Sequence, residues 1–295
     1  MSLSQTICFQ LAKRQVLRRQ PGAAGENPAT FETRAYHDWR VAELRTQFTQ
    51  HFAESELAGK DVLDFGCGSG TLSVLAAEAG ARSVIGIDLN DDLIGQAQAF
   101  AETRKLKTPL RFVAAQNART LDLPDASVDL LLCFDVLEHV LAYDAIIPEW
   151  RRVLRPGGEI FIWWVPWLHP YGHHIESLVP LPWAHVFFSE RTLLNVCARV
   201  YDLPEFKPRW WDLDEHGRKK PNKWRQLDQL PDLNRLTIAQ FERLCQHTGL
   251  QIARRALYGF GGSRLGRLTR GLTRLPWLRE YFCSRVIYRL RKAAL

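Results

Sequence analysis

Three glycines and two acidic residues form the first group in this sequence that could do chemistry. The run Asp64-Phe65-Gly66-Cys67-Gly68-Ser69-Gly70 stands between an apolar segment and a helix-forming one. Glycines at this spacing let the backbone turn tightly and let a ligand approach the main chain without meeting a Cβ atom. Asp88 ends the next apolar segment, where a carboxylate can accept both hydroxyls of a ribose. The pattern predicts a nucleoside cofactor. Thr71 and Leu72 replace the last glycine of the dinucleotide fingerprint G-x-G-x-x-G, so a dinucleotide is disfavoured.

Four segments in order resemble the motifs of the class I S-adenosylmethionine-dependent methyltransferases. They are VLDFGCGSG (62–70), IGIDLN (85–90), LDLPDASVDLLLCFDVLEHV (121–140) and LRPGGEIFIWWVP (154–166). The resemblance covers residues 60–166 and, more loosely, 237–258. It implies S-adenosyl-L-methionine as the cofactor and methyl transfer as the reaction.

The resemblance also implies how the glycine loop is used. Backbone groups of Gly66, Cys67 and Gly68 would hold the methionine end of the cofactor, and Gly70 would open the following helix. Asp64 would lie near the ammonium group of the methionine.

The adenosine end would be held by residues that follow the next strands. By the same resemblance, Asp88 would hold the ribose hydroxyls and Leu89 would lie against the adenine. Asn117 and Ala118 would lie at the adenine amine, where the family often has Asp-Ala; an Asn can still accept that hydrogen bond through its amide oxygen. Phe134 would face the transferred methyl group.

Methyl transfer to a hydroxyl also needs a group that removes the hydroxyl proton. We expect this catalytic group among five side chains: Asp135, His139, His173, His174 and His185.

The segment DVLEHV (135–140) resembles the ExxEH segment of metal-assisted O-methyltransferases, which include the ubiquinone-biosynthesis enzymes and the small-RNA 2′-O-methyltransferases. This implies a divalent ion such as Mg²⁺, held by Asp135, Glu138, His139 and His185. Residues at i, i+3 and i+4 share a helix face and can converge on one ion. The alternative is that Glu138 and His139 only orient the acceptor.

Short apolar segments alternate with helix-forming ones around these motifs. Strands are expected at 61–66, 83–88, 110–115, 128–135 and 159–165, with helices starting at 70, 91 and 143. Near-continuous apolar strands of this kind predict a parallel sheet covered on both faces. With the resemblance, this gives an α/β, Rossmann-like, doubly wound sheet of seven mostly parallel strands, with strand 7 antiparallel and a lid inserted after strand 5.

We expect four parts in the chain. They are a basic arm with helices (1–58), the cofactor-binding core (59–165), an inserted lid rich in Trp and His (166–232), and a completion of the core with a basic helix and an edge-like last strand (233–295). A segment as long and irregular as 166–232 is typical of a lid. Its tryptophans would either line an acceptor pocket or pack the lid onto the sheet.

The basic helix expected near the C-terminal end has two faces. One carries Leu265, Leu268, Leu272 and Leu275, and the other carries Arg264, Arg267, Arg270 and Arg274. Such a helix fits either peripheral contact with an anionic membrane or a stripe of leucines that faces the core.

The distribution of charge bears on the class of partner. The net charge of +7 is the sum of +4 in residues 1–20, +10 in residues 251–295 and −7 in the body between them. An acidic body disfavours a nucleic-acid groove beside the motifs. Six scattered cysteines without a CxxC pair fit a reducing compartment, and no apolar run is long enough to span a bilayer, so we expect a cytoplasmic protein.

These observations favour O-methylation of a small hydrophobic or aromatic hydroxylated acceptor. The alternatives are an RNA or a lipid-linked acceptor and, from another class, a non-catalytic partner protein with the same fold.

Overall fold

The computed structural model describes residues 2–18, 34–208, 212–214, 216–230, 233–261 and 263–294. The chain divides into two compact units. The first, which we call the sheet unit, comprises Ala29–Trp164, Ile238–Ala256 and Val286–Leu295. The second, the accessory unit, comprises Met1–Pro28, Val165–Thr237 and Leu257–Arg285. The predicted lid falls in the accessory unit, together with segments at 1–28 and 257–285 that the sequence analysis assigned to other parts.

A seven-stranded sheet has the order β3-β2-β1-β4-β5-β7-β6. Its strands are β1 (Asp61–Phe65), β2 (Ser83–Asp88), β3 (Leu110–Ala114), β4 (Val128–Phe134), β5 (Leu154–Trp164), β6 (Leu250–Gly259) and β7 (Cys283–Lys292). The neighbours from β3 to β5 pair in parallel, and β5 pairs antiparallel with β7. This confirms the predicted Rossmann-like fold. The expectation of an edge position for the last strand is wrong, because β7 lies between β5 and β6.

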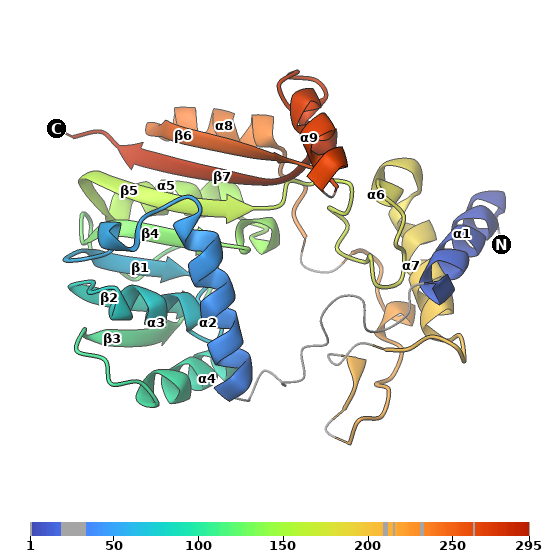
Figure 1. The fold of residues 1–295 in the computed structure, drawn as a ribbon, viewed down its shortest axis with the longest axis horizontal. Helices are drawn as coiled ribbons and strands as arrows, with labels where there is room; N and C mark the ends of the chain where they lie inside the picture. The colour runs from blue at the N-terminus through green and yellow to red at the C-terminus, as the bar shows by residue number, and fades with distance from the viewer. Residues whose placement is uncertain are drawn as a thin grey trace. The chain divides into compact units, whose positions relative to one another are not determined.

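Parallel pairing brings the carboxyl ends of neighbouring strands to one edge of the sheet (Figure 1). β1 ends at Phe65, β2 at Asp88 and β4 at Phe134. The strand order reverses between β1 and β4, and such a switch point is where open α/β sheets bind ligands.

The described helices of the sheet unit are α2 (Arg34–Thr49), α3 (Thr71–Glu78), α4 (Asp91–Glu102), α5 (Tyr143–Val153) and α8 (Ile238–His247), with the one-turn 3-10 helices η1 (Glu54–Glu56) and η2 (Leu137–His139). Helices α3, α4 and α5 begin at or within one residue of the predicted starts at 70, 91 and 143. Asn90 caps α4, because its side chain accepts hydrogen bonds from the backbone N–H groups of Asp92 and Leu93. Right-handed crossovers place α3 and α4 on one face of the sheet and α5 on the other.

The core of this unit lies on β4 and β5. Leu131, Leu132 and Ile160 are fully buried, as is Trp150 on α5. Burying one such side chain contributes about 1.5–3 kcal/mol, so these strands hold their carboxyl ends at fixed positions for the site.

The accessory unit is helical. It contains α1 (Leu3–Arg18), α6 (Ala184–Phe187), α7 (Glu190–Tyr201), the 3-10 helix η4 (Lys223–Arg225), α9 (Ser263–Leu272) and α10 (Arg279–Phe282). α1 and α7 pack through buried residues that include Cys8, Phe9, Val196 and Cys197. The hydrophobic core of this unit therefore forms between segments far apart in the sequence.

The tryptophans of the predicted lid pack within the accessory unit where the structure describes them. Trp224 is buried in its core and Trp167 packs against that core. The indole N–H of Trp183 donates to the backbone oxygen of Tyr281 over 2.9 Å. Trp210 and Trp211 lie outside the described residues.

All six cysteines are buried and unpaired, as expected for small apolar residues in a chain without disulfides. Across the described ranges, no helix combines the length and the apolar character needed to cross a membrane.

Candidate functional site

The glycine loop after β1 is a left-handed turn with an open surface. Gly66 has φ +73° and Gly68 has φ +50°. A Cβ atom on Gly66 would lie 2.4 Å from Cγ1 of Val136, whereas one on Gly68 would meet nothing within 4 Å. Gly66 is therefore required by close packing, and Gly68 by its backbone conformation at a point where a ligand can approach.

The loop is tied to the end of β2 through Asp88. The backbone N–H of Gly68 donates to Oδ2 of Asp88 over 2.8 Å, and that of Asn90 donates to Oδ1 over 3.0 Å. A carboxylate oxygen has two lone pairs, so each oxygen of Asp88 can accept one further hydrogen bond. This leaves the two acceptors that a ribose diol requires. Leu89, next in the chain, exposes 56% of its surface.

Asp64 lies beneath the loop as a buried carboxylic acid. It is 2% exposed and accepts a 2.6 Å hydrogen bond from Oγ of Ser73. Burial, with a smaller contribution from the charge of Asp88, raises the pKa of Asp64 to about 7. Burial also raises the pKa of the Cys67 thiol, which makes it an unreactive neighbour.

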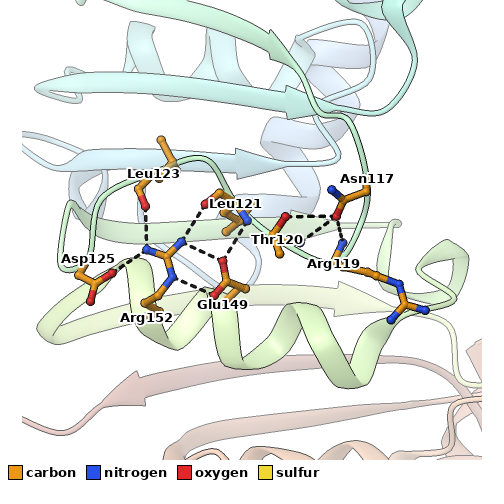
Figure 2. Close-up of polar contacts among 8 residues, drawn as sticks. All are labelled: Asn117, Arg119, Thr120, Leu121, Leu123, Asp125, Glu149 and Arg152. Atoms are coloured by element: carbon orange, nitrogen blue, oxygen red, sulfur yellow. Dashed lines mark hydrogen bonds and ion pairs between the residues drawn. The ribbon is translucent and has the colours of Figure 1, made fainter.

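Asn117 caps the loop that follows β3. Its amide oxygen accepts hydrogen bonds from the backbone N–H groups of Arg119, over 2.8 Å, and Thr120, over 3.0 Å (Figure 2). These contacts fix the orientation of the amide and occupy its oxygen. The group left to meet an adenine is the amide NH₂, a donor, so the predicted hydrogen bond from an adenine amine to this oxygen has no support in the geometry.

A guanidinium on α5 holds the same loop further along, which the sequence analysis missed. Arg152 donates to the backbone oxygens of Leu121 and Leu123, each over 2.8 Å, and to Oδ1 of Asp125 over 2.7 Å (Figure 2). Glu149 accepts from Arg152 and from the backbone N–H of Leu121, and the hydrogen bond from Arg152 lowers the pKa of Glu149. The i, i+3 spacing of this pair was the available signal.

Phe134 at the end of β4 belongs to an aromatic cluster within the sheet unit. Its ring centroid lies 6.0 Å from that of Phe48, 6.1 Å from that of Phe52 and 5.8 Å from that of Trp163. Phe48 and Phe52 come from α2 and the turn after it, so this N-terminal segment packs against the carboxyl ends of β4 and β5. Phe48, Phe52 and Trp163 are buried, whereas Phe134 is partly exposed, so the cluster holds the Phe134 ring at the end of β4.

Asp135 follows Phe134 in a left-handed conformation, with φ +55°. Its backbone N–H donates to the oxygen of Trp163 over 3.0 Å. The guanidinium of Arg40 lies 3.7 Å from its carboxylate. Arg40 stands 95 positions earlier in the sequence, and no local pattern linked it to Asp135.

The prediction that Asp135, Glu138 and His139 share one helix face is wrong. The left-handed residue Asp135 precedes a single 3-10 turn over Leu137–His139, not an α-helix. Glu138 is 5% exposed, whereas His139 is exposed. Within the described part of the chain, no three His, Cys, Asp or Glu side chains come together as a metal site. The residues proposed for Mg²⁺ do not fit one, and we derive no step through a metal.

Two of the predicted histidine bases hold the backbone of the accessory unit. His173 is fully buried; Nδ1 accepts from the N–H of Ile175 over 3.2 Å, and Nε2 then donates to the oxygen of Leu181 over 3.2 Å. Nε2 of His185 bonds the oxygen of Trp167 over 2.7 Å. Burial lowers the pKa of His173 to about 3 and that of His185 to about 4. His174 is exposed, with φ +51°.

Comparisons with known proteins identify what the central part of the chain is similar to. Residues 63–162 match the family model described as a methyltransferase domain. A ubiquinone biosynthesis O-methyltransferase of Methylococcus capsulatus is 36% identical over 121 residues, which are 41% of this chain and 49% of that protein. One of Pseudomonas putida is 32% identical over 143 residues, 45% of this chain and 60% of that protein. The chain thus spans about half the length of the curated relatives it matches.

Solved structures show the same architecture. A Pyrococcus horikoshii protein has a TM-score of 0.51 at 17% identity, over 91% of this chain and 96% of that one. A Listeria monocytogenes protein, described as an S-adenosylmethionine-dependent methyltransferase, has a TM-score of 0.50 at 17% identity, over 85% of this chain and 99% of that one. Residues 63–162 therefore match the methyltransferase-domain family, and the chain shares the Rossmann-like fold of these solved structures.

Proposed function

We propose that this protein transfers a methyl group from S-adenosyl-L-methionine to a hydroxyl of a small hydrophobic or aromatic acceptor. The observation that carries the proposal is the Asp88 carboxylate, which Gly68 holds at the switch point with one free lone pair on each oxygen. The methyltransferase family match over residues 63–162 and the relatives named for ubiquinone O-methylation support it.

The loop residues fit the two ends of the cofactor. The open surface above Gly68 admits the methionine end, and Asp64 is a carboxyl group that a nearby ammonium would hold in its ionised form. Asp88 would accept the ribose hydroxyls, and Leu89 offers an exposed apolar side chain to the adenine. When bound, the cofactor supplies an activated methyl group on a sulfonium.

The acceptor side is supported by Phe134 and Asp135. The partly exposed ring of Phe134, held by the buried rings of Phe52 and Trp163, favours an apolar or aromatic acceptor over a highly charged one. In this proposal Asp135 would accept the proton of the acceptor hydroxyl, and the bound cofactor would supply the methyl group that replaces it. Arg40, 3.7 Å away, would help to orient that carboxylate. His139 and His174 are exposed and stay alternatives for the base.

The identity of the acceptor depends on segments outside the family match. That match covers residues 63–162 and so includes no part of the accessory unit, whose segments are Met1–Pro28, Val165–Thr237 and Leu257–Arg285. The ubiquinone relatives therefore support a hydroxyl on an aromatic ring as the kind of acceptor. Residues of this chain outside the family match would select which substituents that ring carries. RNA is disfavoured by the −7 charge of the body between residues 20 and 251.

Two measurements on the full chain test the proposal. Isothermal titration calorimetry should show one S-adenosyl-L-methionine site, and a radiolabelled methyl donor should label phenols or catechols from a panel of hydroxylated aromatic compounds. Absence of cofactor binding would favour the non-catalytic alternative. If RNA is labelled and no small acceptor is, the proposed methyl transfer stands but its acceptor is RNA.

A further inference from the structure

Helix α9 packs against its own unit through small residues. Oγ1 of Thr269 donates to the backbone oxygen of Phe260 over 2.6 Å, and Thr269 and Thr273 are buried. A Cβ atom on Gly259 would lie 2.4 Å from the backbone oxygen of Gly266. The inward face of the helix is therefore the one with Gly and Thr.

Three of the four leucines of the predicted stripe are exposed, and Leu272 is half-buried. Leu265 is 49% exposed, Leu268 67% and Leu275 42%, and Trp277 in the following turn is 70% exposed. The alternative of a core-facing leucine stripe is therefore wrong for these positions. A run of large exposed apolar side chains on one short segment marks an interaction surface.

Arginines accompany the leucines without any acidic residue among them. Arg264, Arg267, Arg270 and Arg274 are all exposed. No Asp or Glu occurs between positions 257 and 279, and Glu280, the next acid, is buried. The surface thus combines apolar side chains with arginines that have no acid near them in the sequence, which is complementary to an apolar layer beneath a layer of anions.

We propose that residues 264–277, the α9 surface, dock the accessory unit onto an anionic phospholipid bilayer. Leu265, Leu268, Leu275 and Trp277 would enter the interfacial layer while the arginines bind lipid phosphates. A stable protein partner usually needs 20–30 residues on each side, more than this short segment offers. The proposal does not depend on methyl transfer, and its test needs neither cofactor nor acceptor.

Vesicle sedimentation of the full chain tests the proposal. Vesicles of phosphatidylcholine with 30% phosphatidylglycerol should bind the protein, and pure phosphatidylcholine should bind it much more weakly. Replacing Arg264, Arg267 and Arg274 by Gln together should weaken binding to the anionic vesicles roughly a hundredfold, at about fivefold per arginine. Leu265→Ser with Leu268→Ser should weaken it at least tenfold. The affected side chains are exposed, so the unfolding temperature should not change.

Matched controls lie in the sheet unit. Lys105, Lys107 and Arg111 are exposed cations, and their joint replacement by Gln changes the net charge equally. Leu141→Ser removes a leucine that is 62% exposed. If these controls weaken binding as much as the α9 variants do, or if the α9 variants bind like the wild type, the proposal is overturned.

A label locates the contact. All six native cysteines are buried, so an environment-sensitive dye should react selectively in Leu268→Cys. Its emission should shift to the blue with anionic vesicles, and no shift would contradict the proposal. A dimer in solution that Leu268→Ser dissociates, with no vesicle binding, would assign the surface to a second copy of the chain and overturn the lipid assignment.

Discussion

The backbone N–H of Gly68 donates to the carboxylate of Asp88 over 2.8 Å and so joins the loop after β1 to the end of β2. The hydrogen bond fixes the carboxylate before any ligand arrives, which reduces the side-chain entropy lost on binding. This hydrogen bond also depends on the left-handed backbone of Gly68. The loop and Asp88 therefore form one structural unit, although 20 positions separate the two residues.

Asp88→Ala should weaken S-adenosyl-L-methionine binding by about 1.5–3 kcal/mol, because the ribose hydroxyls lose a charged acceptor. Titration calorimetry measures the change. Asp91→Ala removes an exposed acid from the first turn of α4 and is the matched control. Equal affinities for the wild type and Asp88→Ala would remove Asp88 from the ribose site.

Two glycine substitutions should distinguish a glycine required by close packing, Gly66, from one required for the approach of a ligand, Gly68. Gly66→Ala places a Cβ atom 2.4 Å from Val136 in a left-handed residue, so it should lower the free energy of unfolding by several kcal/mol. Gly68→Ala meets no atom within 4 Å, and the left-handed backbone should cost it about 1–2 kcal/mol. Urea denaturation measures both effects. Cofactor titration of Gly68→Ala should then show a loss of affinity larger than its loss of stability; an unchanged affinity would argue against close approach of the ligand at this residue.

Asp64 should make stability fall as pH rises. Its pKa is about 7 in the folded protein against 3.8 for a free Asp side chain, so the folded state binds more protons than the unfolded state between these values. Below pH 3.8 the ionisation of Asp64 does not affect the free energy of unfolding. From about pH 4 to pH 7 it lowers that free energy progressively, and above that range the loss amounts to roughly 4 kcal/mol.

Asp64→Asn keeps an acceptor for Ser73 and removes this titration. Urea denaturation at pH 5 and pH 8 should show a smaller drop in stability for Asp64→Asn than for the wild type. The comparison is needed because His173, whose pKa is lowered to about 3, acts in the opposite sense, with stability lost as pH falls below 6.5. Parallel pH profiles for the two proteins would show that Asp64 is ionised throughout.

The features that the sequence predicts correctly are those that depend on interactions between residues close together in the chain. The strands at 83–88 and around 61–66, the helix starts and the turn at Gly66–Gly70 depend on neighbouring residues, and the structure has them at or within a residue of the predicted positions. Arg40 beside Asp135 could not be predicted, because the contact joins residues 95 positions apart.

Two interpretations that rest on residue spacing in the sequence do not hold in the structure, because tertiary contacts determine the outcome. The spacing of Asp135, Glu138 and His139 fits an α-helix, but the chain leaves β4 through a left-handed residue and makes only one 3-10 turn. The leucines of α9 have the spacing of a core-facing stripe, but the close approach to Gly259 admits only the Gly and Thr face of the helix. In both cases the spacing of residues in the sequence predicts which of them would share a helix face, but not whether the helix forms or what that face contacts.

Arg152→Lys should loosen the loop between β3 and β4. A lysine keeps the charge, but its three N–H donors on one nitrogen cannot replace the five hydrogen bonds that the guanidinium makes (Figure 2), so stability should fall by about 1–2 kcal/mol. Hydrogen exchange should speed up at residues 117–125. Arg151→Lys changes the exposed neighbour on the same helix and should have neither effect; equal effects of both variants would show that the loop does not depend on the guanidinium of Arg152.

Asp135→Asn should test the base directly. Loss of a general base lowers kcat by about 10²–10⁴-fold, whereas cofactor affinity should be unchanged because Asp135 is assigned to the acceptor. His139→Gln, four positions on and exposed, should lower kcat little; the reverse pattern would transfer the role to His139. EDTA should leave turnover unchanged, since the described acids and histidines do not assemble a metal site. Loss of turnover on chelation, restored by Mg²⁺, would mean that the residues around Asp135 rearrange when cofactor and acceptor bind.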